Sequence, residues 1–561
     1  MVLIVFLSSA LTVFAAYNFI NYLQLNSYSL FKTIKNYLLK HAVEAVGVFV
    51  LSLIFLTANL FISETALKVA LYIFFCVFTR SAISSRNRIK KRTAKTPLVF
   101  TNRIKRLYAV LSVFCTAVFF AAYFILRRID DYIIFAYIFS ACNMLAYAIS
   151  AAIIKPFERL NNRRYIKKAV KKLDGFERLF RIGITGSYGK TSVKNILYKM
   201  LSKKYKTVAT DKNYNTPLGI VKTLQKIDGA TEIFIVEMGA RRKGEIRELC
   251  GMVKPHCGVI TGITNQHTET FKTLDNVIAT KSELYFGRQE GGVCFFNGDD
   301  ENIIGLPLLN NDDAVVVTTG LRSDGGGATA RRAYARAESV VTTTGGCSFI
   351  LSFGQNFPRR NKLINGDLGD GGQAEGAAFS PTDNSAVSIA VSTRLIGRAS
   401  VTNISVAAAV AYYLGVSAEE IKQAIEELEP TAHRTEVIRS GDMTIIDDAY
   451  NCNPVGAASA IDVLKLFGGR KLVVTCGFAE QGKNLAAENA RLGGLIAEAA
   501  DAVILIGRGG KYIKDGLLER GFAEQSVYEY PSLSEAKKHF PEIFASGDVI
   551  LFENDMPDNA E

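Results

Sequence analysis

The chain has 561 residues, a net charge of +13 and 49% hydrophobic residues. This length exceeds one ordinary domain, so we expect about three or four domains. Its nine cysteines form no C-x-x-C pair and no metal-ligand spacing. That pattern argues against a disulfide framework and a zinc site, and it favours a reducing compartment. The apolar excess lies in the first third of the chain.

Apolar stretches of bilayer-spanning length, roughly 17–25 residues, occur in that first third at 1–20, 42–62, 107–126 and 132–153. A shorter stretch at 65–79 pairs with its predecessor as a hairpin. The first stretch lacks a basic start and a clear cleavage site, so it does not read as a removable signal peptide. We therefore predict a transmembrane helical module at 1–155 with about five spans, or about three if the hairpin does not insert.

Two basic runs flank the predicted spans. The first extends from Arg86 to Arg106 without an acid, and the second lies in a basic juxtamembrane linker at 156–175. The positive-inside rule puts both runs in the cytoplasm and the N-terminus outside. Nucleic acid is an alternative partner, but attraction to anionic lipid accounts for the charge without one. We expect contacts with membrane lipids and none with nucleic acid.

A glycine-rich loop follows a short apolar strand at 181–185, where the composition becomes that of a soluble α/β protein. The loop, Gly186 to Ser192, leads into a segment with apolar residues at helical spacing. Strand, glycine loop and helix N-terminus form the geometry that surrounds nucleotide phosphates. Lys190 would reach the β- and γ-phosphates, and Thr191 would hold a magnesium ion. Ile184 replaces the glycine of the common P-loop pattern, and an accidental glycine-rich turn is the alternative.

Three polar residues downstream could serve the same site. Glu237 ends an apolar strand, and the carboxyl ends of parallel strands line the ligand crevice, so Glu237 could hold a metal. His267 follows a second strand at 258–263, and Lys281 lies within an apolar helical pattern. Taken singly, His267 is better explained as a structural hydrogen-bonding residue and Lys281 as a solvated surface lysine.

The order of these segments resembles the central domain of the Mur ligases, most closely their D-alanyl-D-alanine-adding branch. The matching segments are the T-G-x-x-G-K-T-S loop, E-M-G-A at Glu237, I-T-N-Q-H-T-E-T-F around His267 and T-K-S-E-L around Lys281. The resemblance implies that Glu237 and His267 help to place a second Mg2+. It also implies that Lys281 is carbamylated and ligates the metal as an anion. The ATP-binding loop residues would be Thr185, Gly186, Ser187, Gly189, Lys190, Thr191 and Ser192.

Two later segments extend the resemblance. The stretch 395–403 corresponds to the family's G-x-H-N-x-x-N segment, but Ala399 and Ser400 replace the first His and Asn, so only Asn403 carries over as a nucleotide contact. The family's D-D-x-Y-N-A-N-P signature lies at 447–454. By resemblance, Arg434 contacts the ATP phosphates and Asp448 the ribose. A surface salt bridge and a turn-forming carboxylate are the respective alternatives. The implied catalytic residues are Lys190, His267, Lys281 and Arg434.

The predicted fold is therefore multi-domain. The N-terminal α-helical membrane module precedes an α/β P-loop ATP-binding central domain at 176–430 and a smaller Rossmann-like α/β C-terminal domain at 431–561. Residues 308–394 are rich in Gly, Ser, Thr and Asn, which predicts a flexible insertion with little core. The membrane module occupies the place of the family's soluble UDP-sugar-binding domain. Residues 552–558 replace the family's glycine-rich ending, which bears on recognition of the amine substrate.

The resemblance implies an ATP-dependent amide-bond ligase of peptidoglycan precursor synthesis. A carboxylate of a UDP-sugar peptide or a lipid-linked precursor would be activated as an acyl-phosphate and joined to an amino acid or a dipeptide such as D-Ala-D-Ala. The expected location is the bacterial cytoplasmic membrane, multi-pass, with the ligase domains in the cytoplasm. Two alternatives remain: a membrane-bound ligase for a lipid-linked or polyglutamate-type substrate, and a non-catalytic nucleotide-binding scaffold.

Overall fold

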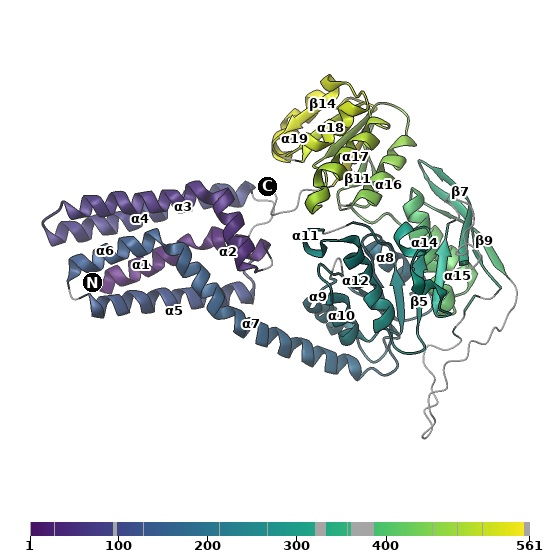
Figure 1. Cartoon of the computed structure of the whole chain (residues 1–561), viewed down its shortest axis with the longest axis horizontal. Coiled ribbons are helices and arrows are strands. Elements are labelled where there is room, and N and C mark those ends of the chain that lie inside the picture. The colour runs from purple at the N-terminus through teal and green to yellow at the C-terminus, as the bar shows by residue number, and fades with distance from the viewer. Residues whose placement is uncertain are drawn as a thin grey trace. The chain divides into compact units, whose positions relative to one another are not determined.

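A computed structural model describes residues 2–26, 28–93, 98–126, 128–211, 214–265, 268–319, 333–355, 357–358, 360, 386–450, 453–479, 481–507 and 509–554. The chain divides into two compact units, 1–165 and 166–556, and Figure 1 shows a helical unit and an α/β unit. The predicted change from an apolar helical module to an α/β protein is thus present in the structure.

The N-terminal unit is built from helices. They are α1 (Val2–Ala15), α2 (Tyr17–Leu25), α3 (Leu30–Leu60), α4 (Thr65–Thr93), α5 (Asn102–Ile125), α6 (Ile129–Ala141) and α7 (Asn143–Asp174), the last of which continues into the second unit. In the described part of the chain, Ile4–Leu25 and Asn102–Ile125 are long and apolar enough to cross a membrane. The bent pair Asp130–Ser140 and Asn143–Asp174 would make a third. The higher span count stays a prediction.

The central domain contains a nine-stranded sheet with the order β2-β3-β1-β4-β5-β6-β7-β8-β9. The first seven strands in this order are parallel, and β8 and β9 are antiparallel to their neighbours. The strands are β1 (Phe180–Thr185), β2 (Thr207–Ala209), β3 (Ile233–Glu237), β4 (Cys257–Ile260), β5 (Val293–Asn297), β6 (Ala314–Thr318), β7 (Ala333–Thr343), β8 (Gly346–Phe353) and β9 (Val387–Thr393). Strands β1, β3, β4 and β5 are buried along their whole length, as expected for parallel strands covered on both faces.

Helices cover both faces of this sheet. One face packs against α8 (Lys190–Leu201), α14 (Arg398–Tyr413) and α15 (Ala418–Glu426). The other packs against α9 (Pro217–Thr223), α10 (Glu245–Val253) and α12 (Leu274–Gly287). Short helices α11 (Thr268–Phe271) and α13 (Glu301–Ile304) lie in the connections. The parallel order places the carboxyl ends of β1, β3 and β4 side by side, which positions the phosphate loop.

The described part of 308–394 is not a flexible insertion with little core, so that prediction is wrong there. Strands β6 to β9 extend the sheet, and Ala335, Phe349, Phe353 and Val391 are buried in its core. The alternation of buried and exposed residues in β8 and β9 is the period-two pattern of strands with one buried face. The many small and hydroxylated residues on the outer face hid this pattern at the sequence level.

The C-terminal domain is a six-stranded sheet with the order β10-β11-β15-β12-β13-β14, in which only β10 is antiparallel to its neighbour. The strands are β10 (Glu436–Ser440), β11 (Met443–Asp448), β12 (Lys471–Thr475), β13 (Ala502–Ile506), β14 (Val527–Tyr530) and β15 (Val549–Glu553). The helices are α16 (Pro454–Lys465), α17 (Leu485–Ala497), α18 (Gly510–Glu519) and α19 (Leu533–Ile543). The parallel βα units agree with the predicted Rossmann-like fold.

Candidate active site

The predicted phosphate loop connects β1 to α8. Gly189 has φ +76°, a left-handed conformation that favours glycine, and a Cβ there would lie 2.7 Å from Oδ1 of Asn403. The backbone N–H of Ser187 donates to the carbonyl of Gly262 (2.7 Å), and the Ser187 hydroxyl donates to the carbonyl of Thr264 (3.2 Å). The loop is therefore held against the residues that follow β4, with Asn403 of α14 against its glycine.

Lys190 lies at the start of α8 with its ammonium directed back over the loop. Its Nζ donates to the carbonyls of Gly186 (2.8 Å) and Ser187 (3.1 Å). Burial, with a smaller contribution from Arg434, lowers the pKa of Lys190 to about 8, against the opposite effect of Glu237. An anionic phosphate at this position would favour the charged ammonium.

Glu237, at the carboxyl end of β3, is 1% exposed and receives three polar partners. The Thr191 hydroxyl donates to Oε2 (2.9 Å), Asn215 Nδ2 donates to Oε1 (3.2 Å), and Nζ of Lys194 lies 3.3 Å from Oε2. A hydroxyl and a carboxylate that meet beside the phosphate loop are oxygen donors of the kind that Mg2+ prefers, so these residues fit the predicted metal.

Lys281 is 3% exposed on α12, so the interpretation of a solvated surface lysine is wrong. Burial, followed by repulsion from Lys190, lowers its pKa to about 7, against the opposite effects of Glu245 and Glu283. A large share of this amine is therefore neutral at physiological pH. The predicted metal ligand His267 lies outside the described residues.

Two pockets lie on either side of the phosphate loop. The first, about 320 Å³, is lined by residues from both domains, among them Gly189, Ser192, Asn403, Arg434 and Asp448. The second, about 380 Å³, is lined by Lys190, Asn215, Glu245 and Lys281 among others. The structure thus brings most of the predicted site residues into adjacent cavities that meet at the phosphate loop.

Thr185 and Ser187 are predicted nucleotide-binding residues whose side chains are committed elsewhere. Thr185 is fully buried, and its hydroxyl donates to the carbonyl of Met238 (2.9 Å). Ser187 is also buried, and its hydroxyl bonds to Thr264. These two side chains hold the loop in place, so they are not available to contact a nucleotide.

Arg434 and Asp448 belong to the C-terminal domain and line the first pocket. Burial lowers the pKa of Arg434, while Glu237 and Asp448 act in the opposite direction. Asp448 accepts hydrogen bonds at Oδ1 from the backbone N–H (2.7 Å) and the hydroxyl (2.9 Å) of Thr435. Both residues thus line the cleft; Arg434 is half-buried there, and Asp448 is fully buried with one oxygen bonded to Thr435.

Sequence reasoning missed two charged residues here, Lys194 and Glu553. Lys194 is 1% exposed and pairs with Glu237, one helical turn after Lys190. Glu553 ends β15 as the register partner of Asp448, is fully buried, and has a pKa raised well above its usual value by burial and by Asp448. The apolar run Val549 to Phe552 before it is the same signal that identified Glu237 at the end of β3.

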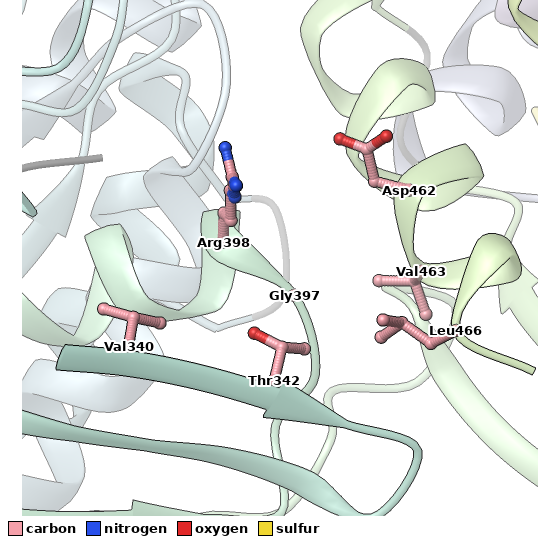
Figure 2. A pocket seen from close by; sticks show the side chains of 7 residues that line it. All are labelled: Val340, Thr342, Gly397, Arg398, Asp462, Val463 and Leu466. Atoms are coloured by element: carbon pink, nitrogen blue, oxygen red, sulfur yellow. The ribbon is translucent and has the colours of Figure 1, made fainter. Parts of the chain in front are cut away.

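A further pocket of about 460 Å³ adjoins the first one and shares Arg398 and Asp462 with it. Figure 2 shows Val340 and Thr342 on β7, Arg398 at the start of α14, Asp462 and Val463 on the opposite helix α16, and Leu466 directly after that helix. The cleft between the domains therefore extends past Arg398, and Ala399 and Ser400, which stand in place of the family's His and Asn, line the first pocket.

Comparisons with known proteins agree with this architecture. The Mur ligase middle domain matches residues 184–411, and the Mur ligase glutamate ligase domain matches residues 433–553. The chain is 27% identical over 376 residues to UDP-N-acetylmuramoyl-tripeptide–D-alanyl-D-alanine ligase of Bacillus subtilis, covering 66% of this chain and 72% of that one. The same ligase of Escherichia coli is 26% identical over 58% of this chain and 64% of its own length.

Two solved structures have the same fold. The MurF structure from Acinetobacter baumannii has a TM-score of 0.57 at 22% identity, covering 70% of this chain and 77% of that one. MurF ligase from Thermotoga maritima in complex with ADP has a TM-score of 0.54 at 21% identity, and the match covers 71% of this chain and 82% of that one. With the two family domains matched in order over the part of the chain that carries the phosphate loop and both pockets, this chain belongs to the Mur ligase family of ATP-dependent ligases.

Proposed function

We propose that this protein is an ATP-dependent ligase that joins the carboxylate of a UDP-N-acetylmuramoyl-tripeptide to the amine of D-alanyl-D-alanine. The observation that carries this proposal is the pair of pockets on either side of the phosphate loop, with Gly189 in one and Lys190 in the other. The names of the similar ligases supply the substrates. The chain spans 57 to 72% of the length of the first three of these relatives.

The geometry supports a phosphoryl transfer from the first pocket to the second. A nucleotide in the first pocket would lie against Asn403, Arg434 and Asp448, with its terminal phosphate at the loop. A carboxylate in the second pocket would then face that phosphate across Lys190. The carboxylate oxygen forms a bond to the γ-phosphorus as the bond to the β-phosphate oxygen breaks, which yields ADP and an acyl-phosphate. Lys190 and Arg434 would orient the phosphates and neutralise their charge.

The second step forms the amide. The neutral amine attacks the acyl carbon, phosphate leaves with its bonding electrons, and the amine gives up a proton. The buried carboxyls Asp448 and Glu553 lie at the strand ends of the C-terminal domain, the domain expected to bring the amine substrate. Exclusion of water by the cleft protects the acyl-phosphate from hydrolysis.

Mg2+ and the carbamate of Lys281 are part of the proposal. Thr191 and Glu237 would hold a magnesium ion, which supplies positive charge beside the transferred phosphoryl group. The buried, largely neutral amine of Lys281 is the form that can add carbon dioxide. A lysine carbamate would present two oxygens and a negative charge between Lys190 and the acceptor pocket. The non-catalytic scaffold is disfavoured, because nucleotide binding alone does not require a buried lysine there.

Residues 1–155 would form a multi-pass module of the bacterial cytoplasmic membrane, with the ligase domains in the cytoplasm. The apolar helices Ile4–Leu25 and Asn102–Ile125 support this location. They also favour a second candidate function, in which the same ligase chemistry acts on a lipid-linked carboxylate that the membrane presents. Both candidates share the nucleotide site and differ in the acceptor.

The test is phosphate release by the detergent-purified full chain with ATP and Mg2+. UDP-N-acetylmuramoyl-tripeptide and D-alanyl-D-alanine are supplied together and then omitted in turn. Release that needs both supports the first candidate. Binding of ATP without release on the soluble sugar nucleotide would overturn it in favour of a lipid-linked acceptor. A chain that binds no ATP would overturn the ligase function altogether.

A further inference from the structure

A small cavity with a cationic wall lies within the N-terminal helical unit. It occupies about 150 Å³ where the end of α2, the start of α3, the start of α5 and the middle of α7 meet. Its apolar walls include Leu23, Leu30 and Leu107, and its charged lining residues are Arg103, Lys155 and Arg159. No acidic residue is among the lining residues that the structure describes. This volume is below the roughly 300–1,000 Å³ of pockets for drug-sized ligands, which suits a single compact anionic group.

Arg103 lies at this wall against the ring of Tyr28, a residue with an unusual backbone conformation. Tyr28 has φ +62°, which is uncommon for a residue other than glycine. Its ring lies under the guanidinium of Arg103, with 3.4 Å between Cζ and the ring centroid. Stacking on an aromatic face orients a guanidinium while its N–H donors remain available at the edge. A conformation of this kind is more common where a side chain serves a binding site.

The carboxylate of Glu158, next to the cavity, is already paired with Arg106. Glu158 is buried and accepts two hydrogen bonds from Arg106, at 2.6 Å and 3.1 Å, while Nε of Arg103 is 3.9 Å away. Glu158 is the only acid between Asn143 and Leu173. Within the described residues, no ion pair joins Lys155 or Arg159 to a carboxylate. The cavity therefore keeps an excess of positive charge.

Apolar side chains continue outward from the cations. Along α7, Ile153, Phe157 and Leu160 are exposed at helical spacing, and Phe31 at the start of α3 is 80% exposed. Cationic residues beside exposed apolar residues are typical of the level where lipid headgroups meet acyl chains. The basic ends of α5 and α7 are also the ends that the positive-inside rule assigns to the cytoplasmic leaflet.

We propose that this cavity binds the phosphate of an anionic lipid, with Arg103, Lys155 and Arg159 around the phosphate and the lipid chains along the apolar face of α7. This site goes beyond the ligase function and does not depend on it. It rests on the proposed location of the helical unit in the membrane.

The experiment uses the full chain in nanodiscs of equimolar phosphatidylglycerol and phosphatidylcholine. After extraction into mild detergent, the phosphatidylglycerol that stays with the protein is counted by mass spectrometry. The test variant is Lys155→Gln/Arg159→Gln, and the matched control is Arg163→Gln/Arg164→Gln, which removes two exposed charges from the same helix outside the cavity. Arg103→Lys keeps the charge and serves as a third variant.

We expect the wild type to retain phosphatidylglycerol over phosphatidylcholine. The test variant should retain about 30-fold less, because it lacks two of the three cations around the phosphate, at about 1 kcal/mol each. The control and Arg103→Lys should retain the lipid. No enrichment in the wild type, or equal loss in test and control variants, would overturn the site. Displacement of the lipid by inorganic phosphate, with the same dependence on Lys155 and Arg159, would show a free-anion site and overturn the lipid assignment. Phosphate release by each variant, measured in parallel, checks the folding of the ligase domains.

Discussion

The two sheets of the α/β unit have different ionisable side chains near the carboxyl ends of their strands. In the central domain these groups are mostly lysines: Lys194 is buried and paired with Glu237, Lys190 lies nearby at the loop, and Lys281 is buried beside Lys190. In the C-terminal domain the buried pair consists of two carboxyls, Asp448 and Glu553, on adjacent strands. A buried charge is costly unless it is paired, so each end is suited to a ligand of the opposite sign. The lysines of the central end suit anionic phosphates, whereas at the C-terminal end burial and Asp448 raise the pKa of Glu553 and favour a shared proton.

Removal of Lys190 tests this contrast most strongly. In Lys190→Ala the loop loses the ammonium that would neutralise the transferred phosphoryl group, so we expect phosphate release to fall by about 10³-fold or more. The assay is ADP and phosphate release under saturating substrates. Lys199→Ala, an exposed lysine on the same helix, is the control. Retention of activity in Lys190→Ala would exclude the proposed role of the loop.

The second prediction concerns Glu237, the carboxylate that pairs with Lys194. Glu237→Gln leaves Lys194 buried without its charge partner, which costs about 3–5 kcal/mol of stability. It also removes a metal ligand, so the Mg2+ concentration for half-maximal phosphate release should rise by about 10- to 100-fold. Thermal unfolding and Mg2+ titration measure the two effects. Glu290→Gln, an exposed acid, should change neither, and an unchanged Mg2+ response in Glu237→Gln would contradict the metal assignment.

The third prediction is a dependence on carbon dioxide and pH that follows from Lys281. Its lowered pKa of about 7 means that the neutral amine becomes the main form as pH rises through 7. Carbamylation, and with it phosphate release, should therefore increase over that range and fall in carbon-dioxide-free buffer. Lys281→Ala should lose about 10²-fold in rate and show no response to bicarbonate. The exposed Lys243→Ala should behave as the wild type. A bicarbonate response that persists in Lys281→Ala would assign the carbamate elsewhere.

The smallest effect is expected at the carboxyl pair of the other sheet. The pKa of Glu553 is raised in the folded chain, so its contribution to stability is fully present below its unfolded pKa and is lost as pH rises above it. Glutamine does not ionise, so Glu553→Gln does not lose this stability as pH rises. Its Tm at neutral pH should exceed that of the wild type by about 2–4 °C for each kcal/mol gained, and the two Tm values should be equal at acidic pH. Exposed Glu519→Gln is the control. A lower Tm at neutral pH would indicate that Glu553 is ionised and paired with a cation.

The phosphate loop and the strand ends were readable from the sequence, because glycine spacing and apolar runs that end in a carboxylate are local patterns. The loop at Gly186 to Ser192 and the strand before Glu237 lie where the patterns predicted them, and 431–561 has the predicted α/β fold. Strands β7 to β9 were missed because small and hydroxylated residues on their exposed face concealed the alternation.

By itself, the sequence determined the family, the order of the domains and the position of the glycine-rich loop, because these depend on residue type and spacing along the chain. Only the tertiary structure decided that Lys281 is buried beside Lys190, that Lys194 pairs with Glu237, and that Glu553 lies against Asp448. Burial and charge proximity join residues far apart in the sequence, and they set pKa values through desolvation and Coulomb interaction that no local pattern records.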